Sequence, residues 1–435
     1  MKRLAIGGGI AIGLVAIAAC ATSEEPIRPS TEPEPEPEPS VLDASVEDVV
    51  VGSDDADIDL SGPPCNAAGW CKTALPDTDL VLRDIWPLPD RAFAIADSKN
   101  AGVKVLEWTS VDSMWRYIDD NSQNEKAFAD FATRIWAPSA EEVYYTVSPG
   151  TVFHGRRPVP PATAWSWSSS RLEDNNSQTI EADITKSYRA LALGVWGTGA
   201  DDVYVWYSNT VFRGERQSEG KIEWVVEYVA DDFGDADEQL IFTGIAGTQS
   251  DDIWFAGSRG KLAAGALCSF VIRKTSEGYR RVADAVRSPN CMAREDVPLF
   301  LGNVKLPLDL QSLGGSRVFF GNVVGMSAVQ IIADGEGYSA RDTVVPPAVW
   351  AGGAGSYVSS FWRESEDLLW LVGGHDVARG IAARGTRIWD DGGTYQLSST
   401  AHNGVPSPVA NRIRGTSATN IWIVGDRYAL HKTTP

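Results

Sequence analysis

The residues best suited to bind a ligand form an acidic run between positions 231 and 238. Five carboxylates lie within these eight residues, on either side of a Phe-Gly pair. Carboxylate oxygens are the ligands that Ca²⁺ prefers, although the spacing is not that of an EF-hand and no distal Glu completes the set. The run therefore allows three interpretations: a Ca²⁺ site, a solvated acidic loop or a patch for a cationic partner. The candidate residues are Asp231, Asp232, Asp235, Asp237 and Glu238.

Signatures of enzymatic chemistry are absent from the chain. It contains no GxSxG elbow, no HExxH pair and no P-loop, and each of these motifs places its catalytic groups by a fixed spacing. The four histidines show no ligand-like spacing, and two of them, His154 and His431, fall at equivalent positions of a repeat described below. We therefore expect no catalysis and no cofactor other than the possible Ca²⁺. The four histidines are His154, His375, His402 and His431.

The N-terminus predicts export. Lys2 and Arg3 precede an apolar run that is too short to span a bilayer, as in a signal peptide over residues 1–20. The segment Ile17-Ala-Ala-Cys20 resembles the bacterial lipobox, which implies lipidation of Cys20; ordinary cleavage with an incidental Cys20 is the alternative. Ala21 resembles the residue that sorts such lipoproteins to the outer membrane, and a lipid anchor would tether the protein to a membrane face.

Residues 21–61 predict a disordered stalk. They contain thirteen acidic residues, a single Arg and no aromatic residue, and their Glu-Pro repeat favours a solvated, extended chain. Of the net charge of −20, the stalk holds −12 and residues 62–435 hold −10, offset by two basic residues at the N-terminus. The folded part is thus moderately acidic without a basic stripe, which argues against a nucleic-acid ligand.

Four cysteines remain once Cys20 is set aside. An even number in an exported chain predicts disulfides. Of the three possible pairings, the one between sequence neighbours is the simplest, namely Cys65–Cys71 with Cys268–Cys291. A zinc site is the alternative, but no CxxC motif supports it.

One unit recurs along the chain, and its clearest copy is Gly194–Gly214. Each copy has an apolar strand, a Gly/Ser/Thr turn, often acidic residues, and then an alternating aromatic strand. Successive aromatics are 51, 60, 50, 65, 51 and 52 residues apart. They are Phe93, Tyr144, Tyr204, Trp254, Phe319, Trp370 and Trp422. The first strand of each copy ends near Trp86, Trp136, Trp196, Ala246, Gln311, Trp362 or Arg414.

A period near fifty residues, built from short strands, is typical of propeller blades. A further strand follows six of the copies at Trp115, Trp167, Trp224, Tyr279, Tyr338 and Tyr395. The seventh copy has none, whereas an unassigned strand, Gly69–Leu75, precedes the first copy. The sequence therefore predicts an all-β, seven-bladed β-propeller over residues 62–435, closed by an N-terminal strand that completes the last blade.

The unit Trp196-Gly-Thr-Gly-Ala-Asp-Asp-Val-Tyr204 is similar to repeats of bacterial exported propeller lipoproteins. The stretch Asp390–Tyr395 resembles the aspartate box of sialidases, although Ile388 stands where Ser or Thr is expected. Both resemblances imply fold rather than activity. The acids that recur once per blade are expected to cap turns through the local backbone. They are Glu141, Glu142, Asp201, Asp202, Asp251, Asp252, Glu366 and Asp367.

The period stretches at three consecutive connections between blades: Ser168–Arg189, Ala230–Ile241 and Ala283–Leu308. In a propeller these connections emerge on one face, so they predict a binding surface. The function expected is that of a cell-envelope lipoprotein, monomeric and anchored in the outer membrane on its periplasmic or cell-surface side, that binds or scaffolds a protein or glycan. The alternative is a glycan-active enzyme, sialidase-like or another glycosidase or lyase, acting at the channel.

Overall fold

The computed structural model describes part of the chain, and all the residues described belong to one compact unit, Asp59–Pro435. The signal peptide, Cys20, the stalk and the acidic run at 231–238 lie outside the described residues. The described residues are 65–122, 131–175, 192–218, 220–230, 239–261, 266–286, 291–292, 294–314, 316–322, 326–335, 337–346, 349, 357–375, 379–390 and 393–435.

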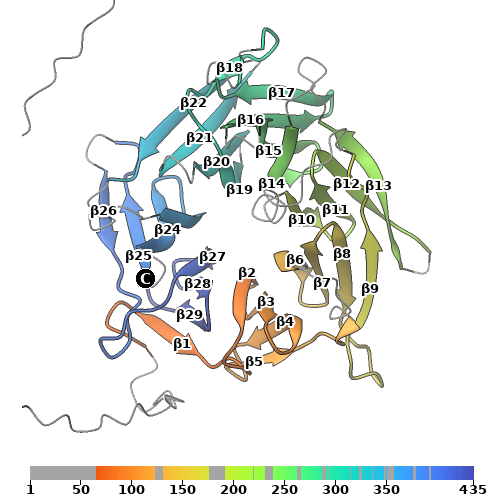
Figure 1. Cartoon of the computed structure of the whole chain (residues 1–435), viewed down its shortest axis with the longest axis vertical. Coiled ribbons are helices and arrows are strands. Elements are labelled where there is room, and N and C mark those ends of the chain that lie inside the picture. Colours follow the sequence, from red (N-terminus) through yellow and green to blue (C-terminus); the bar gives the residue numbers. More distant parts are fainter. Residues whose placement is uncertain are drawn as a thin grey trace, which may run out of the picture. The chain divides into compact units, whose positions relative to one another are not determined.

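Seven antiparallel sheets stand around a central axis (Figure 1). The fold is a seven-bladed β-propeller. In blades one to six the first strand along the chain lies innermost and the others follow outward. The seventh blade consists of the last three strands of the chain and of the strand Trp70–Thr73, which lies outermost. The inner strands are β2 (Val81–Pro87), β6 (Phe131–Ser139), β10 (Leu193–Gly199), β14 (Gln239–Gln249), β19 (Pro307–Gly314), β23 (Tyr357–Arg363) and β27 (Ala410–Ser417).

The remaining strands follow outward in each blade. The second strands are β3 (Arg91–Ser98), β7 (Glu142–Ser148), β11 (Asp202–Tyr207), β15 (Asp252–Lys261), β20 (Arg317–Asn322), β24 (Leu368–His375) and β28 (Asn420–Gly425). The third strands are β4 (Gly102–Thr109), β8 (Thr151–Arg156), β12 (Thr210–Arg216), β16 (Ala266–Thr275), β21 (Ser327–Asp334), β25 (Arg379–Thr386) and β29 (Tyr428–Lys432). The outer strands are β5 (Met114–Tyr117), β9 (Ser166–Arg171), β13 (Ile222–Val229), β17 (Gly278–Asp284), β22 (Gly337–Val344), β26 (Thr394–Leu397) and β1 (Trp70–Thr73). Every recurring aromatic used to align the sequence lies in a second strand, so the predicted repeat and its seven blades are confirmed.

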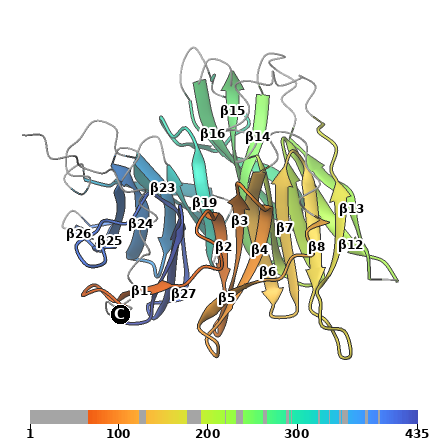
Figure 2. The same cartoon turned by 60° about the horizontal axis from the view of Figure 1, so that its bottom comes forward.

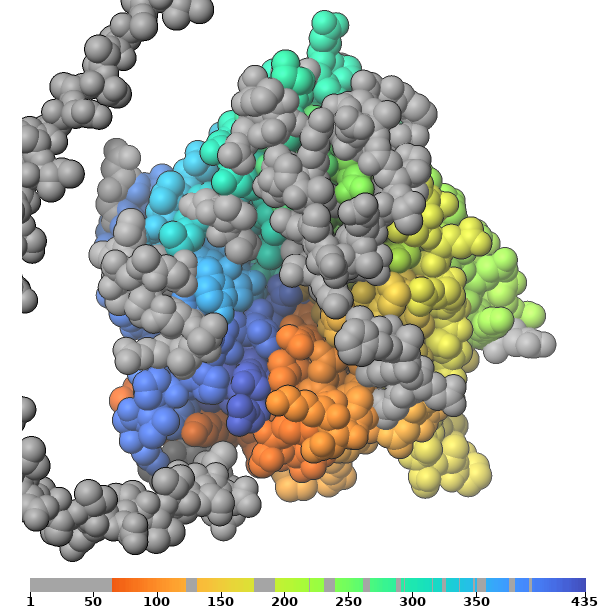
Figure 3. Space-filling view, viewed as in Figure 1, coloured from red at the N-terminus to blue at the C-terminus, as the bar shows by residue number. Residues whose placement is uncertain are grey.

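The first and seventh blades meet where the ring closes (Figure 3). β1 pairs antiparallel with β29, from Trp70 opposite Lys432 to Thr73 opposite Ala429. The Trp70 side chain is fully buried and packs edge-on against Trp370 of the sixth blade, with ring centroids 5.7 Å apart. The seventh sheet therefore joins the two ends of the described chain.

Packing between blades explains why the aromatics recur. In each inner strand the residue just before the aligned position is apolar and buried, because alternate side chains point toward the neighbouring blade. In two blades a third-strand histidine stacks on the second-strand aromatic, His154 on Tyr144 at 4.5 Å and His431 on Trp422 at 4.0 Å. Both histidines thus pack as repeat residues, as predicted.

The recurring acids stabilise the blades in a different way from the turn capping that we expected. Asp202 and Asp252 form ion pairs with arginines of the third strand of their own blades, Arg213 at 3.5 Å and Arg273 at 2.8 Å. These contacts need a long cationic side chain on the neighbouring strand, which turn chemistry does not reveal. These two acids therefore have a structural role, which they fulfil through ion pairs between strands.

Glu142 also pairs across strands, with His154 at 2.6 Å and with Arg216 of the next blade at 2.8 Å. Burial raises the pKa of Glu142, but the hydrogen bonds from His154 and Arg216 outweigh that effect and lower it to about 2. The carboxylate therefore stays ionised and links two blades.

The two ends of the propeller differ. We call one end the loop face: it is the end at which each connection between blades leads into an inner strand. The opposite end, at which each inner strand turns into the second strand, is the hairpin face. Blade four projects beyond its neighbours (Figure 2), and its strands β14, β15 and β16 have 11, 10 and 10 residues. The projecting end holds the start of β14, where Gln239 pairs with Gly260, and the pair of Lys261 with Ala266, which places it on the loop face.

The connection Ala283–Leu308, predicted as a long loop, contains a short strand. Residues of β18 (Leu299–Phe300) pair parallel with the end of β17 and give blade four a fifth strand. The pairing joins Ala283 with Leu299. Part of this connection is therefore held against the outer edge of its own blade.

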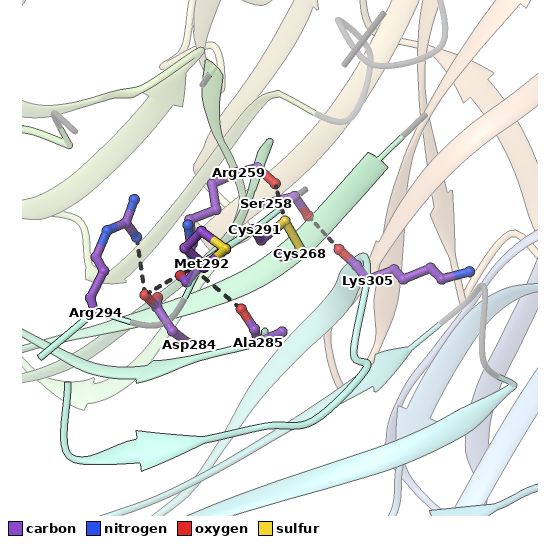
Figure 4. Close-up of a disulfide and its surroundings, with 9 residues drawn as sticks. All are labelled: Ser258, Arg259, Cys268, Asp284, Ala285, Cys291, Met292, Arg294 and Lys305. Carbon is purple, nitrogen blue, oxygen red and sulfur yellow. Dashed lines mark hydrogen bonds and ion pairs between the residues drawn. A yellow bond between two sulfur atoms is a disulfide. The ribbon is translucent and has the colours of Figure 1, made fainter. Parts of the chain in front are cut away.

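Both disulfides join the predicted sequence neighbours, Cys65 with Cys71 and Cys268 with Cys291. The second fastens the connection after β17 to strand β16 (Figure 4). Beside it the buried Arg259 donates to the carbonyl of Met292 at 2.6 Å, and Arg294 pairs with the buried Asp284 at 3.0 Å. Burial raises the pKa of Asp284 to about 6, against the opposing effect of Arg281 and Arg259. The rim of blade four on the loop face is thus covalently fixed.

The lowered pKa of His431 leads to a prediction of how the free energy of unfolding changes in mild acid. Burial lowers the pKa of His431 to about 4 from 6.5, so between these values the unfolded chain binds a proton that the folded protein excludes. Stability should therefore fall as the pH decreases from 6.5 to 4, by about 2 to 3 kcal/mol. Urea unfolding of the protein and of His431→Gln at pH 6.5, 5.5 and 4.5 tests this. The variant should lose less stability on acidification; an equal loss in both proteins would contradict the assignment.

Candidate functional site

The inner strands place one layer of charged side chains at the centre of the ring. This layer lies two residues before the aligned position in each inner strand. Its members are Asp84, Arg134, Gly194, Gly244, Asp309, Ser360 and Arg412. Arg412 of the seventh blade contacts Asp309 of the fifth, and Arg134 of the second blade lies 4.0 Å from the same carboxylate. Side chains from non-adjacent blades therefore meet across the channel, and we call this set the channel layer.

An irregularity of the strands recurs beside this layer. Six inner strands carry a register shift at or next to the channel-layer residue, for example between Leu82 and Asp84 and between Ala410 and Arg412. A bulge breaks the strict alternation of a strand and redirects a side chain. Local backbone geometry thus turns these polar side chains toward the axis rather than into the apolar layer between blades.

Asp84 is fully buried and accepts three contacts. One oxygen accepts a hydrogen bond from the backbone N–H of Ile135 in the next inner strand at 3.1 Å. The other lies 3.2 Å from Nε of Arg412 and 3.1 Å from Nε of Arg414. A buried carboxylate is tolerated when it is paired and hydrogen-bonded, and Asp84 satisfies both conditions.

Asp309 has the same double role. It accepts the backbone N–H of Phe361 at 2.8 Å and pairs with Arg412. Burial raises the pKa of Asp309, against the opposing effect of Arg134 and Arg414. Both acids of the layer therefore tie one inner strand to the next while they neutralise arginines.

The positive charges are not fully matched. Three guanidinium groups, those of Arg134, Arg412 and Arg414, face two carboxylates, which leaves one formal positive charge. Arg134 is 5% exposed, its Nη1 has no hydrogen-bond partner, and its nearest acidic oxygen is 4.0 Å away. Burial lowers the pKa of Arg134, while Asp84 and Asp309 act in the opposite direction. Arg134 therefore has a single long ion pair and no hydrogen bond at Nη1, and a buried cation that is paired so weakly is costly.

A cavity of about 250 Å³ adjoins these cations. It reaches from the channel layer toward the hairpin face, because its lining includes the aligned residues and those just after them. Arg414 lies over the ring of Trp86 at 5.2 Å. The lining is Trp86, Arg134, Ile135, Val195, Trp196, Trp206, Thr243, Gly244, Ile245, Ala246, Gly247, Asp309, Leu310, Gln311, Ser312 and Arg414.

The absence of side chains in part of the channel layer creates this space. A Cβ at Gly194 would lie 2.2 Å from the Trp206 ring and 2.7 Å from Cγ of Arg134. Glycine at this position lets Arg134 and Trp206 pack side by side. The second glycine of the layer, Gly244, lines the cavity itself. The channel is therefore open on the side of blades three and four.

The groups that line this cavity suit the binding of an anion. The lining contains no His, Cys, Glu or Tyr, and its one acid, Asp309, is paired with Arg412. Guanidinium groups, an amide and indole rings are groups that hold an anion with an apolar body.

Metal ligands and membrane spans give no further site. Among the described residues, no group of three or more His, Cys, Asp or Glu side chains could hold a metal ion. No helix within the described ranges is long and apolar enough to cross a membrane. The predicted acidic run, Asp231, Asp232, Asp235, Asp237 and Glu238, lies outside the described residues, as does Cys20.

The channel layer was missed in the sequence although a signal for it exists. The aligned positions Trp86, Trp196, Gln311 and Arg414 were identified, and each lines the cavity. Moving two residues back in every copy yields the mixture of Asp, Arg, Gly and Ser, where a repeat that served packing alone would keep one residue type. The signal available in the sequence was that the residue type at this position differs from copy to copy.

Comparison with known proteins extends only to the fold. The WD40 repeats of RRP9 superpose with a TM-score of 0.51 at 9% identity, over 85% of this chain and 98% of that one. The likeness is one of architecture. Virginiamycin B lyase from Staphylococcus aureus matches with a TM-score of 0.49 at 11% identity, over 84% and 98% of the two chains. YCF48 from Cyanidioschyzon merolae matches at 0.48 and 13%, over 84% and 99%. No family model matches the chain, and no curated protein does.

Proposed function

We propose that this protein is a lipid-anchored binding or scaffolding propeller of the bacterial cell envelope, and that it engages a protein partner through the loop face. The observation that supports this most directly is the fixed, projecting rim of blade four. Its strands extend past the neighbouring blades, and a disulfide fastens the adjoining connection. A rigid projection presents a contact surface at low entropic cost on binding.

Exposed apolar side chains also lie at this end of the molecule. Met292 and Phe300, in the connection after blade four, are 62% and 52% exposed. Val229 and Val344, at the loop-face ends of their outer strands, are also exposed. Exposed apolar side chains beside a rigid projection suit a surface that a partner covers.

The proposed location in the cell rests on the N-terminal sequence. The lipobox-like Ile17–Cys20 and the acidic Pro/Glu segment support an anchor followed by a stalk. The two disulfides fit an oxidising compartment. Fractionation of a Cys20→Ala variant tests the anchor, which predicts that the variant leaves the membrane fraction.

In-cell crosslinking of the full-length protein tests the partner. We expect a reproducible envelope protein crosslinked at the loop face, and we expect Phe300→Ser to reduce its yield several-fold, because the substitution removes apolar contact area at the rim. Val111→Ser is the matched control, since Val111 is 91% exposed in the turn from β4 to β5 on the hairpin face. Equal crosslinking by both variants, or none by the wild-type protein, would refute the scaffold.

A further inference from the structure

At the central cavity three arginines face two carboxylates, which leaves an excess of one positive charge. The hydrogen-bonding groups of Asp84 and Asp309 are already occupied by backbone N–H groups and by Arg412. Nη1 of Arg134 has no hydrogen-bond partner among the described residues, and the side chain lines the cavity. Arg414 uses Nε to reach Asp84 and lies on Trp86, so its terminal nitrogens are left for the cavity.

From this geometry we infer that the channel is a binding site for a small monocarboxylate with a flat apolar body. Arg134 and Arg414 receive the carboxylate, and the rings of Trp86 and Trp196 contact the body. The amide of Gln311, also in the lining, is held in place because it donates to the carbonyl of Phe361 and accepts from the backbone N–H of Arg363. The inference rests on the channel alone and is independent of the partner proposed for the loop face.

The charge balance selects the class of anion. One unmatched positive charge is neutralised by a single negative charge, whereas a phosphate dianion would leave the site with an excess of one negative charge beside two buried carboxylates. Charges in a low-dielectric site interact strongly, so this difference has a large effect on affinity. The planar fork of a guanidinium also matches the two oxygens of a carboxylate.

Size and access agree with a small ligand. A volume of about 250 Å³ lies just below the usual range for small-molecule pockets, so it suits a ligand of one ring and not a chain of sugars. The aligned residues Trp86, Trp196, Gln311 and Arg414 are partly exposed, whereas Arg134 and Asp309 below them are buried. A ligand entering from the hairpin face would thus meet the indole rings first and the cations at the bottom.

Isothermal titration with benzoate and with its neutral isostere benzamide tests the site on the full-length protein. Benzoate should bind measurably, and benzamide should bind at least about tenfold more weakly, because it lacks the charge-assisted hydrogen bonds. Inorganic phosphate should also bind more weakly than benzoate. Benzoate should raise the unfolding temperature, as expected of any ligand specific for the folded state.

The variants Arg134→Met and Arg414→Met remove one cation each while keeping an apolar stem of similar length. Each should weaken benzoate binding at least about tenfold. Arg427→Met is the matched control, because the Arg427 side chain is 67% exposed on a surface turn, and it should bind benzoate like the wild-type protein. Circular dichroism confirms folding, and Arg134→Lys, which keeps the charge, replaces Arg134→Met if that variant does not fold.

Three results would overturn the inference. They are no benzoate binding up to millimolar concentration, equal affinity for benzoate and benzamide, and unchanged affinity in both arginine variants. Tighter binding of phosphate than of benzoate would reject the monocarboxylate class.

Discussion

Replacing Asp84 with Ala should destabilise the protein by about 3 to 5 kcal/mol, as is typical when one partner of a buried ion pair is removed. Asp84 is fully buried, bonds the backbone of Ile135 and pairs with Arg412 and Arg414. Its loss would raise the unmatched positive charge of the channel from one to two and leave the Ile135 N–H without an acceptor. Urea unfolding at pH 7 measures the effect.

Two further variants separate charge from hydrogen bonding. Asp84→Asn keeps an acceptor for Ile135 and removes only the charge, so its cost should be smaller than that of Asp84→Ala. Asp112→Ala breaks an exposed pair with Arg116, whose side chains are 38% and 62% exposed, and should cost less than about 1 kcal/mol. A cost for Asp84→Ala as small as that of Asp112→Ala would show that the channel layer does not stabilise the ring.

Replacing Trp70 with Ala should cost about 3 to 5 kcal/mol and loosen the closure of the ring. Trp70 is fully buried, packs against Trp370 at 5.7 Å and donates from Nε1 to Ser398 at 2.8 Å. Since it is the main buried anchor of the four-residue strand β1, hydrogen exchange at residues 70–73 should become much faster than in the wild-type protein.

Trp254→Ala is the control for this prediction. Trp254 is also fully buried, but it lies in blade four and belongs to a different core cluster. It should lower the overall stability to a similar extent, and β1 should then exchange only through global unfolding. If both variants expose β1 equally relative to their stabilities, Trp70 is an ordinary core residue and not a closure device.

The fold could be predicted from the sequence because its signal is repeated seven times. A single alternating strand such as Val203–Tyr207 is weak evidence, whereas an aromatic at a regular spacing in seven copies fixes both strand type and blade number. The disulfide pairing followed for a similar reason, because both bonds join cysteines that are neighbours in the sequence. Sequence patterns were therefore sufficient to predict the features that are formed by residues close together in the chain.

The channel could not be predicted because its contacts join residues far apart in the chain. Asp84 and Arg414 come from the first and last inner strands, and Asp309 meets an arginine two blades away. Which charges face the axis depends on bulges that shift the register by one residue, and a shift of one residue reverses the direction of a side chain. The acids of the hairpins misled us for a different reason, since their partners Arg213 and Arg273 lie on the neighbouring strand and not in the turn.

The pairing of β1 with β29 has a consequence for the order in which the protein is made. The first strand to be synthesised has its partner among the last, so it must remain unpaired while nearly the whole domain is translated. Six blades can form from consecutive residues as they emerge, but the seventh assembles only afterwards. Until then the first blade exposes the apolar face that packs against the seventh, and a chaperone that covers this face and the unpaired β1 would protect the chain from aggregation. A truncated chain that lacks β29 therefore leaves β1 without its partner strand, whereas a chain that includes β29 can close the ring.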